Sequence, residues 1–409
     1  MLKNYFKIAI AVLRRRKFFT FISLFGISFT LTILLVLTAF IDKVVGDNYP
    51  DRKRDRSLYV NGLEETGKDG MSNGPLSFYF LSHYTSTLKT PVKVAISSSI
   101  DYANTYVNNK KISIFFKYTN ADYWDILEHD FLEGKAFNKN QIDNAEKVAV
   151  ISEDLKKDYF GDVPSVVGKY IEANNVKYRV TGVVKNIPIT SYMISSDIYL
   201  PYTVSNAADY KDKGYRGRYM AILLAPSKAD VPKMQQEYEQ MIQRIPMESK
   251  EFNKIYSHAE SYIASYVNTG NEGSSGVTYA LTAISIFVFL FMLLPTLNLV
   301  NINITRIMER SSEIGVRKAF GASSRTLVYQ FIVENIILTL LGGVIGVILS
   351  FIAIQILNSA NLIANLELSI NFTVLFIGLL VCLVFGLLSG VYPAWRMSKL
   401  NVVTALKDQ

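Results

Sequence analysis

The sequence has little of the chemistry that reactive or metal-binding sites use. It contains one cysteine, Cys382, so no disulfide can form within one chain, and any outer domain must be stabilised by its hydrophobic core. The three histidines, His83, His129 and His258, lie far apart along the chain. None belongs to a His-Glu-x-x-His motif, so packed or solvated side chains are favoured over metal ligands, and no metal site is predicted.

A nucleotide-binding loop is also missing. A P-loop requires Gly-x-x-x-x-Gly-Lys followed by Ser or Thr, because backbone amides hold the phosphates and the hydroxyl holds magnesium. The three Gly-Lys pairs are followed instead by Asp69, Ala136 and Tyr170. Carboxylates such as Asp122 and Asp125 carry no feature that separates catalysis from a solvated helix face. We therefore expect neither an enzyme active site nor a cofactor in this chain.

Long apolar runs place the chain in the membrane class. Half of its 409 residues are hydrophobic, and residues 18–41 form a run of 24 without a charge. As a helix this run spans about 36 Å, which is enough to cross a hydrocarbon core. Similar runs cover residues 277–305, 327–357 (interrupted only by Glu334) and 372–393. Four transmembrane helices are predicted.

A basic cluster, residues 14–17, precedes the first run. Such a cluster also precedes secretory signals, but this run is longer than a signal core, and no clear small-x-small cleavage site follows it. An uncleaved anchor is therefore favoured. Apolar residues at helical spacing within residues 1–17 predict an amphipathic helix in the membrane interface, in contact with lipid.

Lysine and arginine indicate the orientation, because short basic loops stay in the cytoplasm. Residues 1–17, 306–325 and 394–409 are basic and are predicted to be cytoplasmic, whereas the short 358–371 loop has no lysine or arginine. The segment 42–275 holds 30 of the 35 acidic residues and is predicted to lie outside, between helices 1 and 2. The positive charge thus follows topology, and no nucleic-acid partner is expected.

Strand and turn signals alternate through the outer segment. Asn108-Asn109 and Asn174-Asn175 each lie between two strand-like runs, and asparagine tolerates positive φ, so both pairs predict hairpins. Ser152 is placed to cap a helix that ends at Gly161.

Farther along, a strand at residues 219–225 precedes a helix that runs to about Arg244. These signals predict an α+β domain inserted between the first two membrane helices. Its polar flanks, 43–56 and 245–275, are expected to extend those helices outward as a stalk.

The 306–325 loop concentrates charge in a short helical span. Glu313 and Arg317 are spaced i,i+4 in the favourable order, and Gly321 can end the helix before Ser323 caps the next. The pattern predicts a short amphipathic helix at the cytoplasmic face that presents charge to a partner. A solvated cytoplasmic loop is the alternative reading.

Small residues mark the last two membrane runs. Gly342 and Gly346, like Gly386 and Gly390, are four residues apart and permit close helix approach. Packing within one chain is favoured over a dimer seam. Glu334 lies inside the third run, where a carboxylate is costly; it indicates either a function with a buried partner or a side chain that reaches the nearby interface.

Three stretches of the sequence resemble the FtsX/MacB permeases, the membrane subunits of mechanotransmitting ABC transporters. Residues 309–346 resemble the Glu-Arg-x-x-Glu-Ile-Gly-x-Arg-x-Ala-x-Gly-Ala stretch of that family and the helix after it. Residues 389–407 resemble its Tyr-Pro-Ala ending, from which Ser398 and Val403 depart. The outer stretches 131–161 and 168–184 resemble the MacB-like periplasmic domain.

The resemblance implies a role for the charged span. It would be the coupling helix that contacts a cytoplasmic ABC ATPase through Glu309, Arg310, Glu313, Ile314, Gly315, Arg317, Lys318 and Gly321. ATP and magnesium would be bound by that partner. Because the chain starts 17 residues before its first membrane run, the ATPase is expected on a separate polypeptide.

The resemblance also implies a function and a place in the cell. The chain is expected to be a multi-pass permease of the bacterial inner membrane with both termini cytoplasmic, paired with a second permease protomer as a homo- or heterodimer. It would convert ATP hydrolysis into motion of the outer domain and drive efflux or extraction of a substrate, with or without a periplasmic adaptor or outer-membrane partner. The alternatives are lipoprotein release, control of a cell-wall hydrolase, or a receptor that senses a periplasmic ligand.

Overall fold

The computed structural model of the protein divides into two compact units, which are described separately. It describes residues 10–384 except for 12, 16, 69, 108–109, 189, 192, 268–275, 288, 291–315, 317–323, 364, 371, 374, 378 and 381–382. The eight predicted coupling-helix residues, Gly386, Gly390 and the 394–409 tail lie outside this part of the chain. So do residues 1–9 of the predicted interfacial helix.

Among the described residues of the membrane unit, two helices are long and apolar enough to cross a bilayer. They are α2 (Lys17–Val45) and α12 (Ser324–Ala360), and the apolar stretches within them are Lys17–Val44 and Ile332–Ala360. A shorter apolar helix, Gly276–Phe287, begins the second predicted span. The second and fourth spans are only partly described, so the count of four transmembrane helices stays a prediction.

The sequence of α2 has two distinct faces. Its buried apolar side chains recur every four residues, which places them on one side of a helix: Ile27, Leu31, Leu35 and Ala39. Phenylalanines occupy an exposed face, where the rings of Phe25 and Phe29 stack with centroids 5.4 Å apart.

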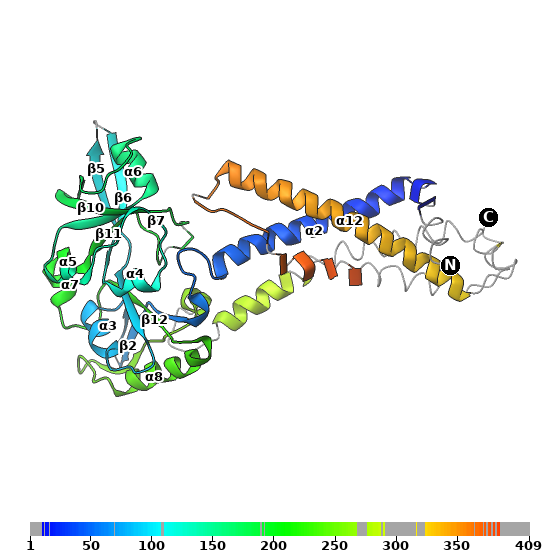
Figure 1. Ribbon diagram of the computed structural model, residues 1–409. Coiled ribbons are helices and arrows are strands. Elements are labelled where there is room, and N and C mark those ends of the chain that lie inside the picture. The colour runs from blue at the N-terminus through cyan, green and yellow to red at the C-terminus, as the bar shows by residue number, and fades with distance from the viewer. Residues whose placement is uncertain are drawn as a thin grey trace. The chain divides into compact units, whose positions relative to one another are not determined.

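The outer domain, residues 44–280 with 363–366, is built on a mixed ten-stranded sheet (Figure 1). Eight strands follow one path: β1 (Ser57–Val60), β12 (Tyr219–Leu224), β4 (Lys93–Ser98), β6 (Lys110–Thr119), β11 (Ile198–Pro201), β8 (Val148–Ser152), β10 (Val176–Val184) and β7 (Phe131–Gly134). Beside this path, β5 (Asp101–Val107) pairs with β6, and β9 (Tyr170–Ala173) pairs with β10. A separate three-stranded sheet has the order β13 (Phe252–Tyr256), β2 (Leu63–Gly67) and β3 (Met71–Gly74).

Helices cover the sheets and complete three hydrophobic clusters. The helices are α3 (Phe78–Thr85), α4 (Asp122–Ile126), α5 (Lys139–Asp143), α6 (Glu153–Phe160), α7 (Ala207–Lys211), α8 (Val231–Arg244) and α9 (Tyr262–Val267). One cluster joins α3 and α8 to β1 and β12, a second surrounds Tyr123 and Tyr199, and a third lies among β6, β8 and β10. The outer domain is therefore α+β, as predicted.

Local signals in the sequence predicted several elements correctly. Strands β5 and β6 pair from Val107 opposite Lys110, and β9 and β10 pair from Ala173 opposite Val176, so both predicted hairpins are confirmed. Asn174 and Asn175 have φ values of 51° and 61°, which this two-residue turn requires.

The predicted helix cap is confirmed as well. The Ser152 side chain accepts a hydrogen bond from the Leu155 amide, and Gly161 ends α6 with φ of 71°. The strand at 219–225 and the helix that ends at Arg244 are present as β12 and α8.

The predicted stalk is wrong where the structure describes it. Helix α2 ends at Val45, and residues 54–56 form a short 3-10 helix that leads into β1. In the second flank, β13 pairs with β2, and α9 packs beside β1. The flanks were read as a stalk because they are polar, but particular residues within them, such as Ala259 and Tyr262, are buried in the core of the outer domain.

Candidate functional site

A charged segment with the sequence Asp-Arg-Lys-Arg-Asp-Arg, residues 51–56, follows α2 after the five residues 46–50. We call its basic side chains Arg52, Lys53, Arg54 and Arg56, with their partners, the basic hub. The four side chains reach three parts of the outer domain: Arg52 and Lys53 contact residues 125–130, Arg54 contacts the end of α2, and Arg56 contacts the turn after β12.

Arg54 is the buried member of the basic hub, with 7% of its surface exposed. Its Nη1 donates to the carbonyl oxygens of Val44, at 3.1 Å, and Gly46, at 2.7 Å, while its Nε donates to Asp51 at 2.9 Å. The last carbonyls of a helix lack intrahelical partners and carry partial negative charge. Arg54 therefore satisfies the end of α2 at the point where the chain enters the outer domain.

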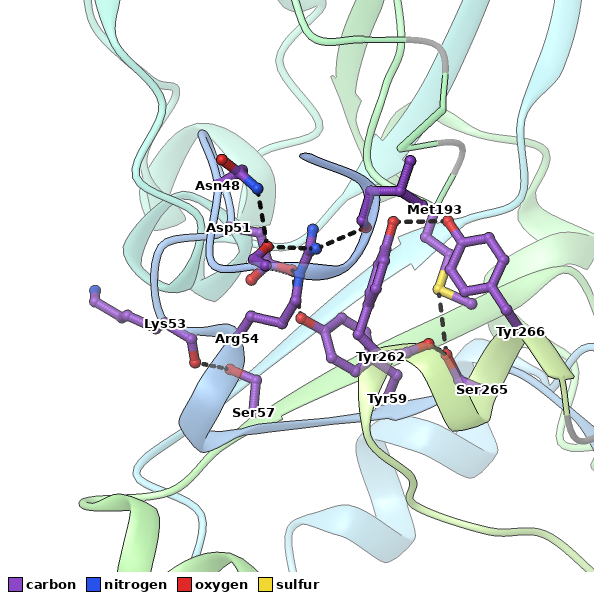
Figure 2. A network of polar contacts seen from close by, with 12 residues as sticks. Asn48, Asp51, Lys53, Arg54, Ser57, Tyr59, Met193, Tyr262, Ser265 and Tyr266 are labelled. Carbon is purple, nitrogen blue, oxygen red and sulfur yellow. Dashed lines mark hydrogen bonds and ion pairs between the residues drawn. The ribbon is translucent and has the colours of Figure 1, made fainter. Parts of the chain in front are cut away.

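Two tyrosines complete the surroundings of Arg54 (Figure 2). The guanidinium carbon lies 3.6 Å from the centre of the Tyr262 ring, and the Tyr59 hydroxyl donates to the same Asp51 oxygen that Arg54 binds. Tyr262 begins α9, and its hydroxyl is 2.8 Å from that of Tyr266. The basic hub thus connects the end of α2 to the helix that precedes the second membrane run.

Burial governs the electrostatics of this cluster. Desolvation raises the pKa of Tyr59 well above its usual value, and the Asp51 carboxylate raises it further, so this hydroxyl keeps its proton and donates a hydrogen bond to Asp51. Desolvation also acts to lower the pKa of Arg54, but the charge of Asp51 and its hydrogen bond to Arg54 outweigh this effect, and the pKa is raised. Arg54 therefore remains charged while buried, as a partner for carbonyl oxygens and a carboxylate must.

The other basic side chains make more exposed contacts. Arg52 donates to Asp130 at 3.0 Å, and Lys53 pairs with Glu128 at 3.0 Å. Arg56 donates to the carbonyl of Pro226 at 2.8 Å, just after β12. Exposed ion pairs contribute about 0–1 kcal/mol each, so these contacts position the segment more than they stabilise it.

An aromatic cluster lies beside the basic hub. The rings of Tyr49 and His129 are 6.4 Å apart, and the Glu128 amide donates to the carbonyl of Pro50 at 2.9 Å. Burial lowers the pKa of His129 to about 3 and raises that of Tyr49 to about 12. Among the described residues neither ring nitrogen of His129 has a hydrogen-bond partner, so this histidine serves as a neutral packing ring.

Of the residues that the sequence nominated, the structure places Gly342, Gly346 and Glu334, all in α12. A Cβ atom at Gly342 would lie 2.7 Å from the Ile27 side chain, and one at Gly346 would lie 3.0 Å from Leu31. The two glycines therefore permit close packing on α2 within one chain. Glu334 is fully buried. The predicted coupling residues and the second glycine pair lie outside the described residues.

Sequence reasoning missed the basic hub. The only available signal was the density of alternating charge in residues 51–56, which is also typical of a solvated loop. Nothing in the local sequence shows that Arg54 is buried, because its acceptors include main-chain carbonyls and an aromatic ring far along the chain.

Comparison with known families also indicates a permease whose outer domain is inserted after its first membrane helix. The family model described as the MacB-like periplasmic core domain matches residues 20–241, and the FtsX-like permease C-terminal model matches residues 285–402. The chain belongs to the MacB/FtsX family of ABC transporter permeases.

Curated relatives agree with this family. The chain is 28% identical over 318 residues to the pyoverdine export ATP-binding/permease protein PvdT of Pseudomonas fluorescens, which covers 74% of this chain and 45% of the relative. It is 24% identical to the macrolide export ATP-binding/permease protein MacB of Acinetobacter baylyi, over 78% of this chain and 46% of that protein. It is 22% identical to the ABC transporter permease YknZ of Bacillus subtilis, over 77% of this chain and 75% of that one. The chain thus spans less than half the length of the first two relatives.

Proposed function

We propose that this chain is the membrane subunit of a transporter that converts ATP hydrolysis in a cytoplasmic ATPase into motion of the outer domain. The ATPase would be a separate subunit, and two permease protomers would work as a dimer in the bacterial inner membrane, with both termini cytoplasmic. The family supports a permease role, and its relatives carry export names.

The observation that carries the proposal is the capping of α2 by Arg54. A membrane helix can move a domain only if its end is held firmly by that domain. Arg54 holds the Val44 and Gly46 carbonyls with two hydrogen bonds from one buried guanidinium, which is itself fixed by Asp51. The residues at the end of α2 are therefore bonded to the segment that leads into β1, and through Arg54 they are linked to Tyr262 of α9.

The test measures motion in the full chain, together with its ATPase, in lipid nanodiscs. In a Cys382→Ser background, a spin label replaces Lys228, an exposed residue of the outer domain. The distance between the labels of two protomers is compared without nucleotide and with ATP and vanadate. We expect this distance to change in the parent protein, and the change to be much smaller in Arg54→Gln while ATP hydrolysis continues.

Arg52→Gln is the matched control, because it removes a neighbouring basic side chain that is half exposed. We expect it to keep the nucleotide-dependent change. If the interprotomer distance in the parent protein is the same without nucleotide and with ATP and vanadate, the proposed motion is overturned. A full response in Arg54→Gln would overturn the role of Arg54 alone and leave the proposed motion standing.

A further inference from the structure

A second feature of the outer domain has no part in the basic hub. An open cleft of about 520 Å³ is lined by residues of α3, β4, α4 and α5, together with Tyr202 after β11. This volume is within the range of small-molecule sites. The cleft lies where the first two hydrophobic clusters meet, since Tyr202 packs against both of them.

Aromatic and aliphatic side chains form the apolar part of the cleft. The rings of Phe78 and Tyr202 stack with centroids 3.9 Å apart and planes inclined by 21°. Ile96 and Ile142 line the cleft beside them, and both are buried. A stacked pair of rings offers a flat surface for another flat or apolar group.

Carboxylates dominate the charge of the cleft. Asp143 is paired with Lys139 at 2.7 Å, so these two charges offset each other. Asp122 is half-buried, and among the described residues its carboxylate accepts one hydrogen bond, a long one of 3.4 Å from the Val94 amide. In the described part of the chain no basic side chain forms an ion pair with Asp122. The nearby Lys93 pairs with Asp125, which raises the pKa of Lys93, and Asp122 lies close enough to raise it further.

We propose that this cleft binds an organic cation: a ligand with an ammonium group and a flat apolar body. The ammonium would pair with the Asp122 carboxylate, while the apolar body would lie against the Tyr202 and Phe78 rings, whose faces also attract positive charge. An anion of the same shape would be repelled by Asp122. The site is independent of the transport role, because it shares no residue with the basic hub or the membrane helices.

The test uses the full chain in lipid nanodiscs with a single reporter cysteine. In a Cys382→Ser background, Ser86→Cys places a thiol at an exposed position on the cleft wall, and the rate of maleimide labelling is measured. Three probes share a phenyl ring and differ in charge: phenethylamine, 3-phenylpropionate and 2-phenylethanol. We expect phenethylamine to slow labelling several-fold, and the other two to have little effect.

Two cleft variants and one remote cysteine sharpen the result. Asp122→Asn should abolish protection by phenethylamine, and Tyr202→Leu should weaken it, while both label at the parent rate without probe if the fold is intact. Ser227→Cys, an exposed thiol that does not line the cleft, should show no protection. Equal protection by all three probes, protection that survives in Asp122→Asn, or no protection by phenethylamine would each overturn the proposal.

Discussion

The Arg54 guanidinium lies over the ring of Tyr262, 3.6 Å from its centre. This contact joins the segment that enters the outer domain to α9, a helix close to the end of that domain. The contact requires both the segment before β1, which carries Arg54, and α9, which carries Tyr262. Arg54 would be an expensive residue to bury without the Asp51 carboxylate and the Val44 and Gly46 carbonyls, because an unpaired charge in a protein interior loses its hydration. The cluster is therefore expected to behave as one unit.

Arg54→Gln should destabilise the outer domain strongly. The substitution leaves Asp51, which is fully buried, without its charged partner, and breaking a buried ion pair costs about 3–5 kcal/mol. Denaturant unfolding of the full chain in detergent would measure the change. Arg52→Gln, which removes an exposed pair, should cost about 0–1 kcal/mol. Equal losses in the two variants would contradict the buried role of Arg54.

Lys117 predicts a dependence of stability on pH. It is fully buried in β6, its Nζ donates to the Ser98 carbonyl at 3.0 Å, and burial lowers its pKa from 10.5 to about 7. Between these two pH values the unfolded chain binds the proton more tightly than the folded chain does. The free energy of unfolding should therefore rise as the pH increases from about 7 toward 10.5.

Lys117→Met should remove this rise and increase stability most at neutral pH, where the wild-type chain bears the cost of the buried amine. Thermal unfolding across the same pH range would show it. Lys177→Met changes an exposed lysine on β10 and should leave the pH dependence as it is in the wild-type chain. An unchanged pH profile in Lys117→Met would show that another group is responsible.

Gly346 should not tolerate a branched side chain. Its carbonyl accepts a hydrogen bond from Thr32 at 3.2 Å, and an added Cβ would lie 3.0 Å from both the Ser28 carbonyl and Leu31. We expect Gly346→Val to cost about 1–3 kcal/mol through overpacking of α12 on α2. Gly26→Val is the control, because a Cβ there meets no described atom within 4 Å. Resistance to unfolding in detergent separates the two, and similar losses would argue against this helix contact.

The coupling helix remains a prediction from the sequence. Single reversals, Glu313→Arg and Arg317→Glu, should weaken association with the ATPase and leave membrane insertion intact, as co-purification and membrane fractionation would show. The double reversal restores a helical pair worth about 0.2–0.5 kcal/mol. If the double variant regained full ATPase binding, the two residues would stabilise their own helix instead of contacting the partner.

How much of the fold the sequence predicts depends on the range of the interaction. The hairpin at Asn174-Asn175 and the Ser152 cap were predictable, because each depends on residues a few positions apart. The pairing of β1 with β12 was not, since Leu58 lies opposite Leu223 and no local signal encodes that register.

The same limit applies to the candidate sites. The local sequence does not indicate a role for Arg54, because its partner Tyr262 is remote in the chain. Asp122 was noticed in the sequence without a role, because its place in a cleft depends on Tyr202 and on α5. A charged residue acquires a recognisable role only when its remote neighbours are known.

The contact between Arg54 and Tyr262 has a consequence for engineering. The match to the periplasmic core family ends at residue 241, yet β13 and α9 follow it and belong to the same compact unit. A soluble fragment cut at the family boundary would lack β13, which pairs with β2, and α9, whose Tyr262 ring packs on Arg54. A fragment that begins before Val44 and ends after Val267 keeps both the β13–β2 pairing and the Tyr262–Arg54 contact. It is therefore the suitable unit for excision, crystallisation or exchange between permeases.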